Sequence, residues 1–256
     1  YDDVQGYEAG NAFFGATIGR VANRIGNGEF QLGGRTYELT RNDGQNTLHG
    51  GRDFYNKRIW KTGKTGEDHV EFLLDSPSGD QGFPGNFEVS VTYTLTDENA
   101  VEIHYEGSCD QDTVVNMTNH SYFNLAGHDA GSIENQTLVL KAEQFSPVID
   151  SASIPTGEHA PVQGTPMDFT SEKAIGAEIE ADFEQLKLTG GYDHNFALDS
   201  VPGPDGLRPL ARVTSPATGI TMTVETTLPG VQFYSGNFMQ GHEKRSGFCL
   251  EPQTFP

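Results

Sequence analysis

The sequence predicts an all-β protein built as a multi-strand sandwich. Apolar and polar residues alternate with a period of two along most of the 256 residues, which is typical of half-buried strands. Thirty-one glycines and thirteen prolines supply the turns that many short strands need. A glycine-rich phosphate loop between a strand and a helix is absent from the sequence, which argues against a nucleotide-binding α/β fold.

The strands are predicted in chain order from this alternation. Glu29–Leu32 and Arg35–Tyr37 flank Gly33-Gly34, and paired glycines tolerate the positive φ of a tight hairpin turn. A second hairpin joins Phe87–Leu95 to Val101–Tyr105 through the turn residues at 97–99. Further strands are predicted at three places, which are His69–Leu74, Thr137–Leu140 and Ile220–Val224.

Two segments depart from this pattern. Ser171–Lys187 is the one plausible helix, although Gly176 weakens it. Phe145–Thr170 is rich in proline but carries scattered apolar residues, so we expect an ordered loop that wraps the sheet. Because the sequence contains no fixed repeat and no low-complexity linker, we predict one domain over residues 1–256.

Composition limits the function. The formal charge of −20 argues against a nucleic-acid partner and favours a neutral ligand. The sequence has no run of about 18 apolar residues, so a membrane role is not expected. Cys109 and Cys249 cannot form a disulfide framework, and reduced thiols indicate a cytoplasmic protein without a visible signal peptide.

A titratable histidine lies where one strand pattern stops. His120 is surrounded by amides, hydroxyls and aromatic rings in the segment Asn116–Gly127. An imidazole exchanges a proton near neutral pH, and its neighbours could bind a polyhydroxylated ligand. Such a histidine, taken by itself, is more often a structural core residue.

Three other segments carry candidate chemistry. Arg24 could bind hydroxyls with its rigid fork of donors, and His49 could donate to a ligand beside Gly50-Gly51, where backbone can approach closely. Glu251 follows Phe-Cys-Leu, so its carboxylate is expected to be buried and suited to proton transfer. Asp193 precedes His194, but neighbouring strand residues point to opposite faces, which disfavours a metal site.

Taken together, these motifs closely resemble the aldose 1-epimerase, or galactose mutarotase, family over essentially the whole chain. The resemblance is carried by five segments in the order of the family, which are Phe14–Ile25, Asn46–Gly51, Thr118–Leu125, Tyr192–His194 and Phe248–Gln253. It implies a large antiparallel β-sandwich, the galactose mutarotase-like supersandwich, with a sugar cleft. No cofactor and no metal are implied, and the partner is a small aldose sugar.

The resemblance also implies roles for individual residues. Glu251 corresponds to the general base and His120 to the general acid, so that a carboxylate and an imidazolium together open and reclose the sugar ring. Substrate contacts are expected from five further residues, which are Arg24, His49, Asp193, Asn23 and Gln232.

Two departures from the family pattern stand out. Family members usually carry extra strands before the segment that matches Tyr1 and after the one that matches Pro256, so we expect this chain to lack terminal strands and be truncated at both ends. Pro252 also follows the expected base, where the family often has a residue such as threonine. A proline there biases Glu251 toward an extended backbone, which we expect the fold to tolerate.

Three alternatives stay open. A hexose-6-phosphate 1-epimerase of the same superfamily would need a cationic phosphate pocket, and the motifs are poor in arginine. A glycosidase could use Asp193 and Glu251 as paired carboxylates. A non-catalytic carbohydrate-binding module would bind sugar without accelerating a reaction.

Overall fold

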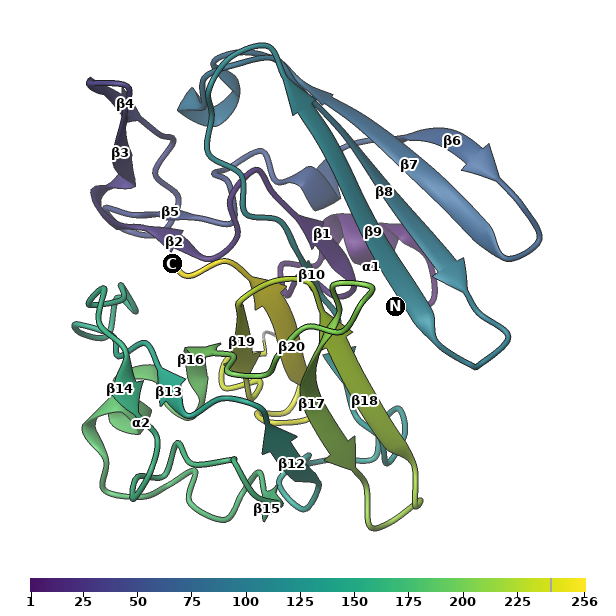
Figure 1. Cartoon of the computed structure of the whole chain (residues 1–256), viewed down its shortest axis with the longest axis vertical. Coiled ribbons are helices and arrows are strands. Elements are labelled where there is room, and N and C mark those ends of the chain that lie inside the picture. Colours follow the sequence, from purple (N-terminus) through teal and green to yellow (C-terminus); the bar gives the residue numbers. More distant parts are fainter. Residues whose placement is uncertain (240) are drawn as a thin grey trace. The chain divides into compact units, whose positions relative to one another are not determined.

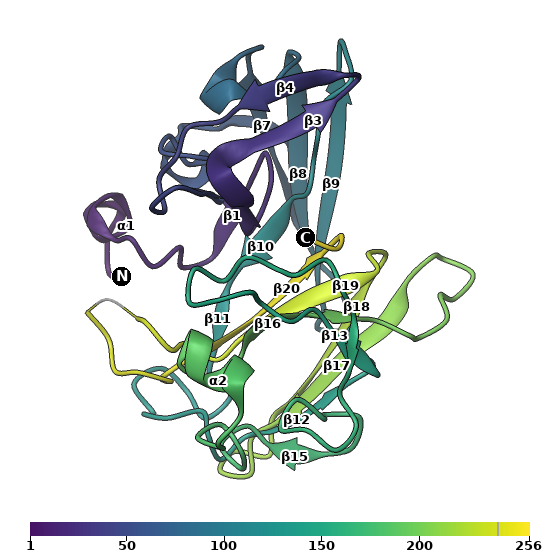
Figure 2. The same ribbon diagram turned by 90° about the vertical axis from the view of Figure 1, so that its left-hand side faces the viewer.

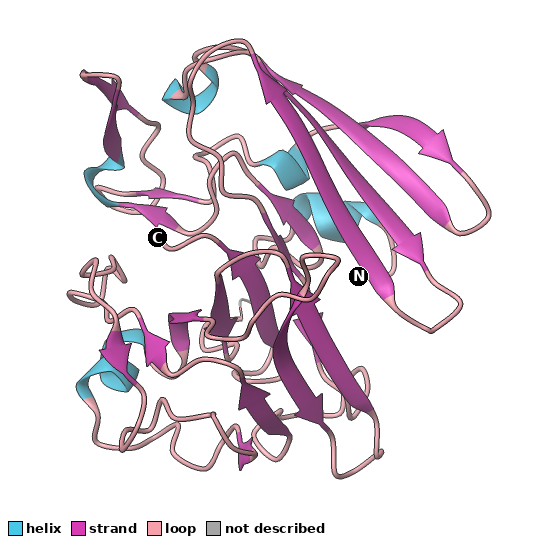
Figure 3. Ribbon diagram, in the orientation of Figure 1, coloured by secondary structure: helices cyan, strands magenta, loops and turns pink. Residues whose placement is uncertain are grey.

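The structure is a computed structural model that describes residues 1–239 and 241–256. The chain divides into two compact units. The larger unit comprises Tyr1–Thr17 and Thr118–Pro256, and the smaller unit comprises Ile18–Met117. Strands dominate both units, and the helices are short (Figure 3). Among the described residues no helix is long and apolar enough to cross a membrane. The single domain over residues 1–256 stays a prediction.

The larger unit is built from two antiparallel sheets (Figure 1). The six-stranded sheet has the order β11 (Tyr122–Phe123), β20 (Phe248–Gln253), β19 (Gly230–Tyr234), β16 (Asp193–Ala197), β13 (Gln144–Phe145) and β14 (Ala160–Pro161). The four-stranded sheet has the order β15 (Lys173–Ala174), β12 (Thr137–Leu140), β17 (Arg208–Thr214) and β18 (Thr221–Thr226). Two short helices, α1 (Val4–Ala9) and α2 (Glu184–Thr189), and the pair β1 (Ala16–Ile18) and β10 (Thr118–His120) complete it.

One hydrophobic cluster joins these two sheets. The six-stranded sheet contributes Phe145, Phe196, Val231, Phe233, Phe248 and Leu250. The four-stranded sheet contributes Leu138, Leu140, Leu210 and Val213. Because both sheets bury one face against the same cluster, the larger unit is a β-sandwich, as the sequence predicted.

The other face of the six-stranded sheet is polar. Side chains alternate along β20, and the strand register places Gln232 opposite Glu251 and Tyr234 opposite both Cys249 and Asp193. We call this surface the polar face, and its members are Tyr122, Asp193, Asn195, Gln232, Tyr234, Cys249, Glu251 and Gln253.

The smaller unit contains the four-stranded sheet β6–β9, of which Figure 2 labels β7, β8 and β9. Its strands are β6 (Lys61–Thr65), β7 (His69–Ser76), β8 (Phe87–Leu95) and β9 (Val101–Cys109). Two smaller ribbons pair β2 (Arg24–Ile25) with β5 (Thr47–Leu48) and β3 (Glu29–Leu32) with β4 (Arg35–Glu38). Three single 3₁₀ turns are η1 (Gly26–Gly28), η2 (Tyr55–Lys57) and η3 (Asp80–Gly82).

Both predicted hairpins are confirmed. Gly33 and Gly34 take φ values of 57° and 75° between β3 and β4, which is the conformation that a two-residue turn requires. β8 pairs with β9 along its full length, from Phe87 opposite Cys109 to Leu95 opposite Val101.

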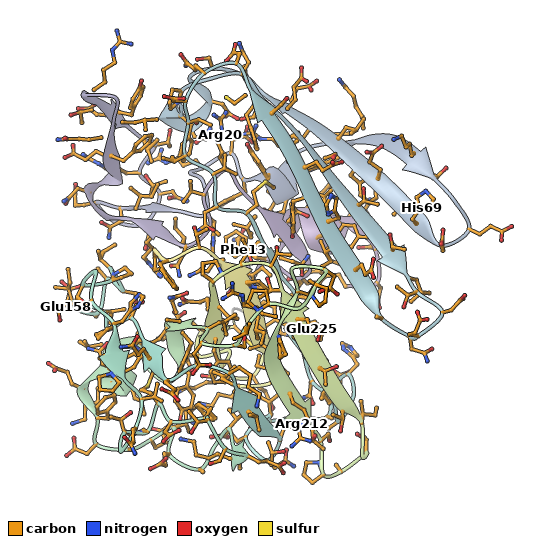
Figure 4. The ribbon with its side chains drawn as sticks, viewed as in Figure 1. Phe13, Arg20, His69, Glu158, Arg212 and Glu225 are labelled. Carbon is orange, nitrogen blue, oxygen red and sulfur yellow. The ribbon has the colours of Figure 1, made fainter. Side chains whose placement is uncertain are left out.

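Arg20 is the largest fully buried side chain of the smaller unit and is labelled in Figure 4. Its guanidinium donates to the carbonyl oxygen of Pro84 at 2.7 Å and to Ser76 Oγ at 2.8 Å. It therefore ties the segment before Arg24 to the loop that enters β8.

The predicted helix over Ser171–Lys187 is wrong for most of its length. Only the last turns are helical, in α2, and Lys173–Ala174 forms β15 beside β12. The amide of Ile175 donates to the carbonyl of Gln136, and Gly176 lies so close to Glu134 that a Cβ would meet it at 2.6 Å. Pairing with the neighbouring chain thus overrides the local helical pattern.

The segment Phe145–Thr170 is an ordered loop, as expected, apart from Phe145 at the end of β13 and the two residues of β14. Val148 and Met167 are buried, whereas Ile149 is exposed. The side chain of Gln185 on α2 holds this loop through Val148, because it accepts from the backbone N–H at 2.7 Å and donates to the carbonyl at 3.1 Å.

Candidate active site

His120 ends β10 and lies within an aromatic enclosure against the polar face. Its ring is 5.6 Å from that of Phe13, which Figure 4 labels, 5.1 Å from Tyr122 and 6.4 Å from Tyr234, measured between centroids. Only 5% of the residue is exposed. This burial lowers the pKa of the His120 imidazole to about 4, because water no longer stabilises its charged form.

Glu251 lies beside this imidazole on β20. Its Oε1 is 3.6 Å from His120 Nε2, and the residue is 4% exposed. The burial inferred from the preceding Phe-Cys-Leu is therefore confirmed. A carboxylate and an imidazole at this separation form a pair that can exchange protons with a ligand bound beside them.

The imidazolium expected from the sequence is opposed by this burial. At neutral pH the ring of the sugar-free protein is neutral, since its pKa is about 4. The neighbouring carboxylate acts in the other direction, because a negative charge 3.6 Å from Nε2 stabilises a proton on the ring. Protonation of the His120 ring for catalysis thus depends on the negative charge of Glu251 and on the groups that a bound ligand places near the ring.

Asp193 and Gln232 form a second pair on the polar face. Gln232 Nε2 donates to Asp193 Oδ1 at 2.8 Å. Gln232 Oε1 is buried and has no hydrogen-bond partner among the described residues. A buried acceptor without a donor is costly, so this oxygen is suited to receive a hydroxyl from a ligand.

His194 lies on the opposite side of β16 from Asp193, as period-two geometry predicted. It packs against Phe145, accepts from the amide of Asp193 at Nδ1 and lies 3.2 Å from Gln185 Oε1 at Nε2. Burial lowers the pKa of His194 to about 3, so this histidine is a neutral core residue.

The remaining predicted site residues lie together in the smaller unit. β2 pairs with β5, which brings Asn23 and Arg24 next to His49. The amide of Asn23 donates to His49 Nδ1 at 3.1 Å, and the amide of His49 donates to the carbonyl of Asn23 at 2.9 Å. Arg24 Nε donates to Asp43 Oδ2 at 2.8 Å, which orients the guanidinium.

The glycines after His49 serve the chain itself. A Cβ on Gly50 would lie 2.1 Å from the carbonyl oxygen of Gly19, and one on Gly51 would lie 2.6 Å from the side chain of Gln81. The close approach expected for a ligand at these glycines is therefore an approach of the protein's own backbone and side chains.

Pro252 is accommodated in β20 because of the strands that flank it. It pairs with Val231 of β19, while β11 on the other side extends only to Cys249. The missing N–H of proline can therefore point to the side on which β11 does not continue. The extended backbone expected at Glu251 is confirmed, since β20 runs through Gln253.

Cys249 was not singled out by sequence reasoning, yet it contacts His120. Its Sγ lies 3.5 Å from His120 Nδ1. The available signal was its spacing, because Cys249 precedes Glu251 by two residues and so shares its face. Together with His120 these are the potential metal ligands that converge within the described part of the chain. One ligand atom from each of the three lies within 4.8 Å of the others, and an ion there would bind only one of the two ring nitrogens.

Comparisons with known proteins agree with this fold. The aldose 1-epimerase family matches residues 1–256. Galactose mutarotase of Bos taurus is 42% identical over 265 residues, covering 100% of this chain and 74% of that protein. Aldose 1-epimerase of Haemophilus influenzae is 41% identical over 264 residues, covering 99% and 75%. A galactose 1-epimerase structure from Lactobacillus acidophilus superposes with a TM-score of 0.88 at 30% identity, covering 100% of this chain and 75% of that one. This chain belongs to the aldose 1-epimerase family and is an isomerase.

Proposed function

We propose that His120 and Glu251 are the acid and the base with which this protein interconverts the α and β anomers of a hexose such as galactose or glucose. The observation that carries the assignment is their geometry. The Glu251 carboxylate on the polar face lies 3.6 Å from the His120 imidazole, which packs against that face from β10, and both are shielded from water.

The reaction is a ring opening followed by reclosure. Glu251 takes the proton of the anomeric hydroxyl, the carbonyl at C1 forms, and the bond from C1 to the ring oxygen breaks. His120 gives a proton to that oxygen. Rotation about the C1–C2 bond presents the other face of the aldehyde, and the reverse proton transfers close the ring with the opposite configuration. Protons and electrons balance without a cofactor.

Ligand binding on the polar face is assigned to Asp193 and Gln232. The carboxylate of Asp193 accepts hydrogen bonds from sugar hydroxyls, and the unpaired Gln232 Oε1 accepts another. Contacts from Asn23, Arg24 and His49 stay predictions, and each is tested by whether its replacement raises KM more than it lowers kcat.

Polarimetry on freshly dissolved α-D-galactose and α-D-glucose tests the proposal. We expect acceleration over buffer, and we expect Glu251→Gln to reduce kcat by about 10³-fold, the scale of a lost general base. Glu225→Gln is the matched control, because Glu225 is an exposed glutamate on β18 of the same unit (Figure 4). Full activity of the Glu251 variant would refute the assignment of the base.

Two further substrates separate the alternatives. A glycosidase would release reducing sugar from a methyl glycoside, whereas an aldose 1-epimerase would leave the glycoside intact. A hexose-6-phosphate epimerase would act faster on glucose 6-phosphate than on glucose. We also propose a cytoplasmic location, supported by two free cysteines, Cys109 and Cys249.

A further inference from the structure

We infer that Cys249 is a positioning residue for His120, whose thiol engages Nδ1 so that Nε2 carries the hydrogen and faces Glu251. The inference rests on the proposed function, because it assigns the orientation of the acid in that reaction. Cys249 itself transfers no proton to the sugar.

The backbone fixes the place of the thiol. Cys249 is in the middle of three strands, opposite Tyr122 on β11 and Tyr234 on β19. It is fully buried, and its Sγ is 3.5 Å from His120 Nδ1. Two residues later the same strand places Glu251 Oε1 3.6 Å from Nε2 of the same ring. One strand therefore contacts both ring nitrogens.

The direction of the sulfur contact follows from the carboxylate. In a neutral imidazole one nitrogen carries hydrogen and the other carries a lone pair. A lone pair at Nε2 would face the Glu251 oxygen and be repelled by it, whereas an N–H is attracted. The carboxylate thus favours the tautomer with hydrogen on Nε2, and in that tautomer the lone pair of Nδ1 can accept the S–H of Cys249.

Donation to Nδ1 requires a protonated thiol, and the surroundings of Cys249 favour that form. Burial raises the pKa of Cys249 well above its usual value, and the charges of Glu251 and Asp193 raise it further. The hydroxyl of Tyr122 hydrogen-bonds to the sulfur, which acts in the opposite direction but is outweighed.

A thiol also serves both states of the acid. When the ring is neutral, Sγ donates to Nδ1, and when the ring is protonated, Nδ1–H donates to Sγ. In both states Nε2–H remains aimed at the Glu251 side. An alkyl side chain could do neither, whereas a hydroxyl could do both.

Steady-state polarimetry on the full chain tests this with three variants. Cys249→Ala should lower kcat about 10-fold, the rate equivalent of one hydrogen bond, and leave KM within about twofold. Cys249→Ser should recover most of that loss. Cys109→Ala, at the end of β9, is the matched control and should behave as wild type. Equal activity of wild type and both Cys249 variants would overturn the inference.

Nuclear magnetic resonance of the imidazole nitrogens gives a readout that does not depend on activity. In the sugar-free wild type, the His120 signals should be those of the Nε2–H tautomer. Cys249→Ala should give a mixture of tautomers, and Cys249→Ser should restore the single form. An unchanged single tautomer in Cys249→Ala would refute the positioning role.

The two measurements separate this inference from the proposed function. If Glu251→Gln keeps full rate while the tautomer shifts in Cys249→Ala, the catalytic assignment fails and the positioning contact stands. If Glu251→Gln is inactive and Cys249→Ala changes neither kcat nor tautomer, the catalytic assignment stands and the positioning role fails.

Discussion

Strand β20 has two sides that exclude water equally but differ in chemistry. Phe248 and Leu250 on one side are 0% and 5% exposed, and Cys249 and Glu251 on the other are 0% and 4% exposed. The first pair belongs to the sandwich core, and the second contacts His120. Burial alone therefore does not separate core from candidate site. What separates them is whether the buried groups are apolar or polar.

Replacing the acid should give the largest effect on the polar side. We expect His120→Asn to lower kcat by about 10²–10⁴-fold, the usual worth of a general acid, with little loss of stability. Polarimetry measures the first, and urea unfolding the second. His128→Asn is the control, because His128 is strongly exposed in the same unit. A variant that loses stability and activity in proportion would make His120 structural instead.

Truncating a core residue should do the opposite. Phe233→Ala removes a fully buried ring and should lower the free energy of unfolding by about 3–5 kcal/mol. Any folded fraction should keep kcat nearly unchanged. Phe238→Ala, at an exposed phenylalanine of the same unit, should change stability by less than about 0.5 kcal/mol. A selective loss of kcat in Phe233→Ala would show that the two sides are not independent.

The pH dependence of stability should reveal two buried histidines, His120 against the polar face and His194 on the core side of β16. Burial holds the pKa of His120 near 4 and that of His194 near 3 in the folded chain, below the unfolded value of about 6.5. As pH falls from 6.5 toward 4, the unfolded state gains protons that the folded state excludes, so stability falls. Each histidine contributes a slope of up to about 1.4 kcal/mol per pH unit.

Chemical denaturation between pH 4.5 and 6.5 measures this slope. His194→Asn should remove about half of the histidine contribution, and His128→Asn should leave the slope unchanged. A slope that is the same in both variants would mean that water reaches His194.

Gln232 should give the smallest of these effects. Gln232→Leu removes the unpaired Oε1 and the donor to Asp193, and we expect KM to rise about 10-fold with kcat little changed. Gln31→Leu, at an exposed glutamine of β3, is the control. An unchanged KM would remove Gln232 from the binding surface.

Strands with one exposed face were predicted from the sequence better than strands that are buried on both faces. β8 and β9 show clear alternation because one side of each is more exposed, and the β3–β4 turn is specified by two glycines. β19 is buried on both faces and is only five residues long, so the alternation of Val231 and Phe233 with Gln232 and Tyr234 is too short to indicate a strand by itself. The helical pattern over Ser171–Lys187 failed because pairing with β12 takes part of that segment.

The site was predictable in part for the same reason. The burial of Glu251 followed from its neighbours, and the opposite orientation of Asp193 and His194 followed from strand geometry. The contact between Cys249 and His120 could not be predicted, because it joins residues 129 positions apart in the chain. Family resemblance, and not local pattern, supplied the roles of acid and base.

The hydrogen bond from the Asn23 amide to His49 limits what the β2–β5 ribbon can recognise. Because Nδ1 accepts that hydrogen, a neutral His49 carries its own hydrogen on Nε2, so the ring acts as a donor at that atom and not as a second acceptor. Arg24 also has donors and no acceptor. A ligand group that hydrogen-bonds to these two side chains must therefore bring lone pairs. A pyranose ring oxygen meets that requirement, and an alkylammonium group does not.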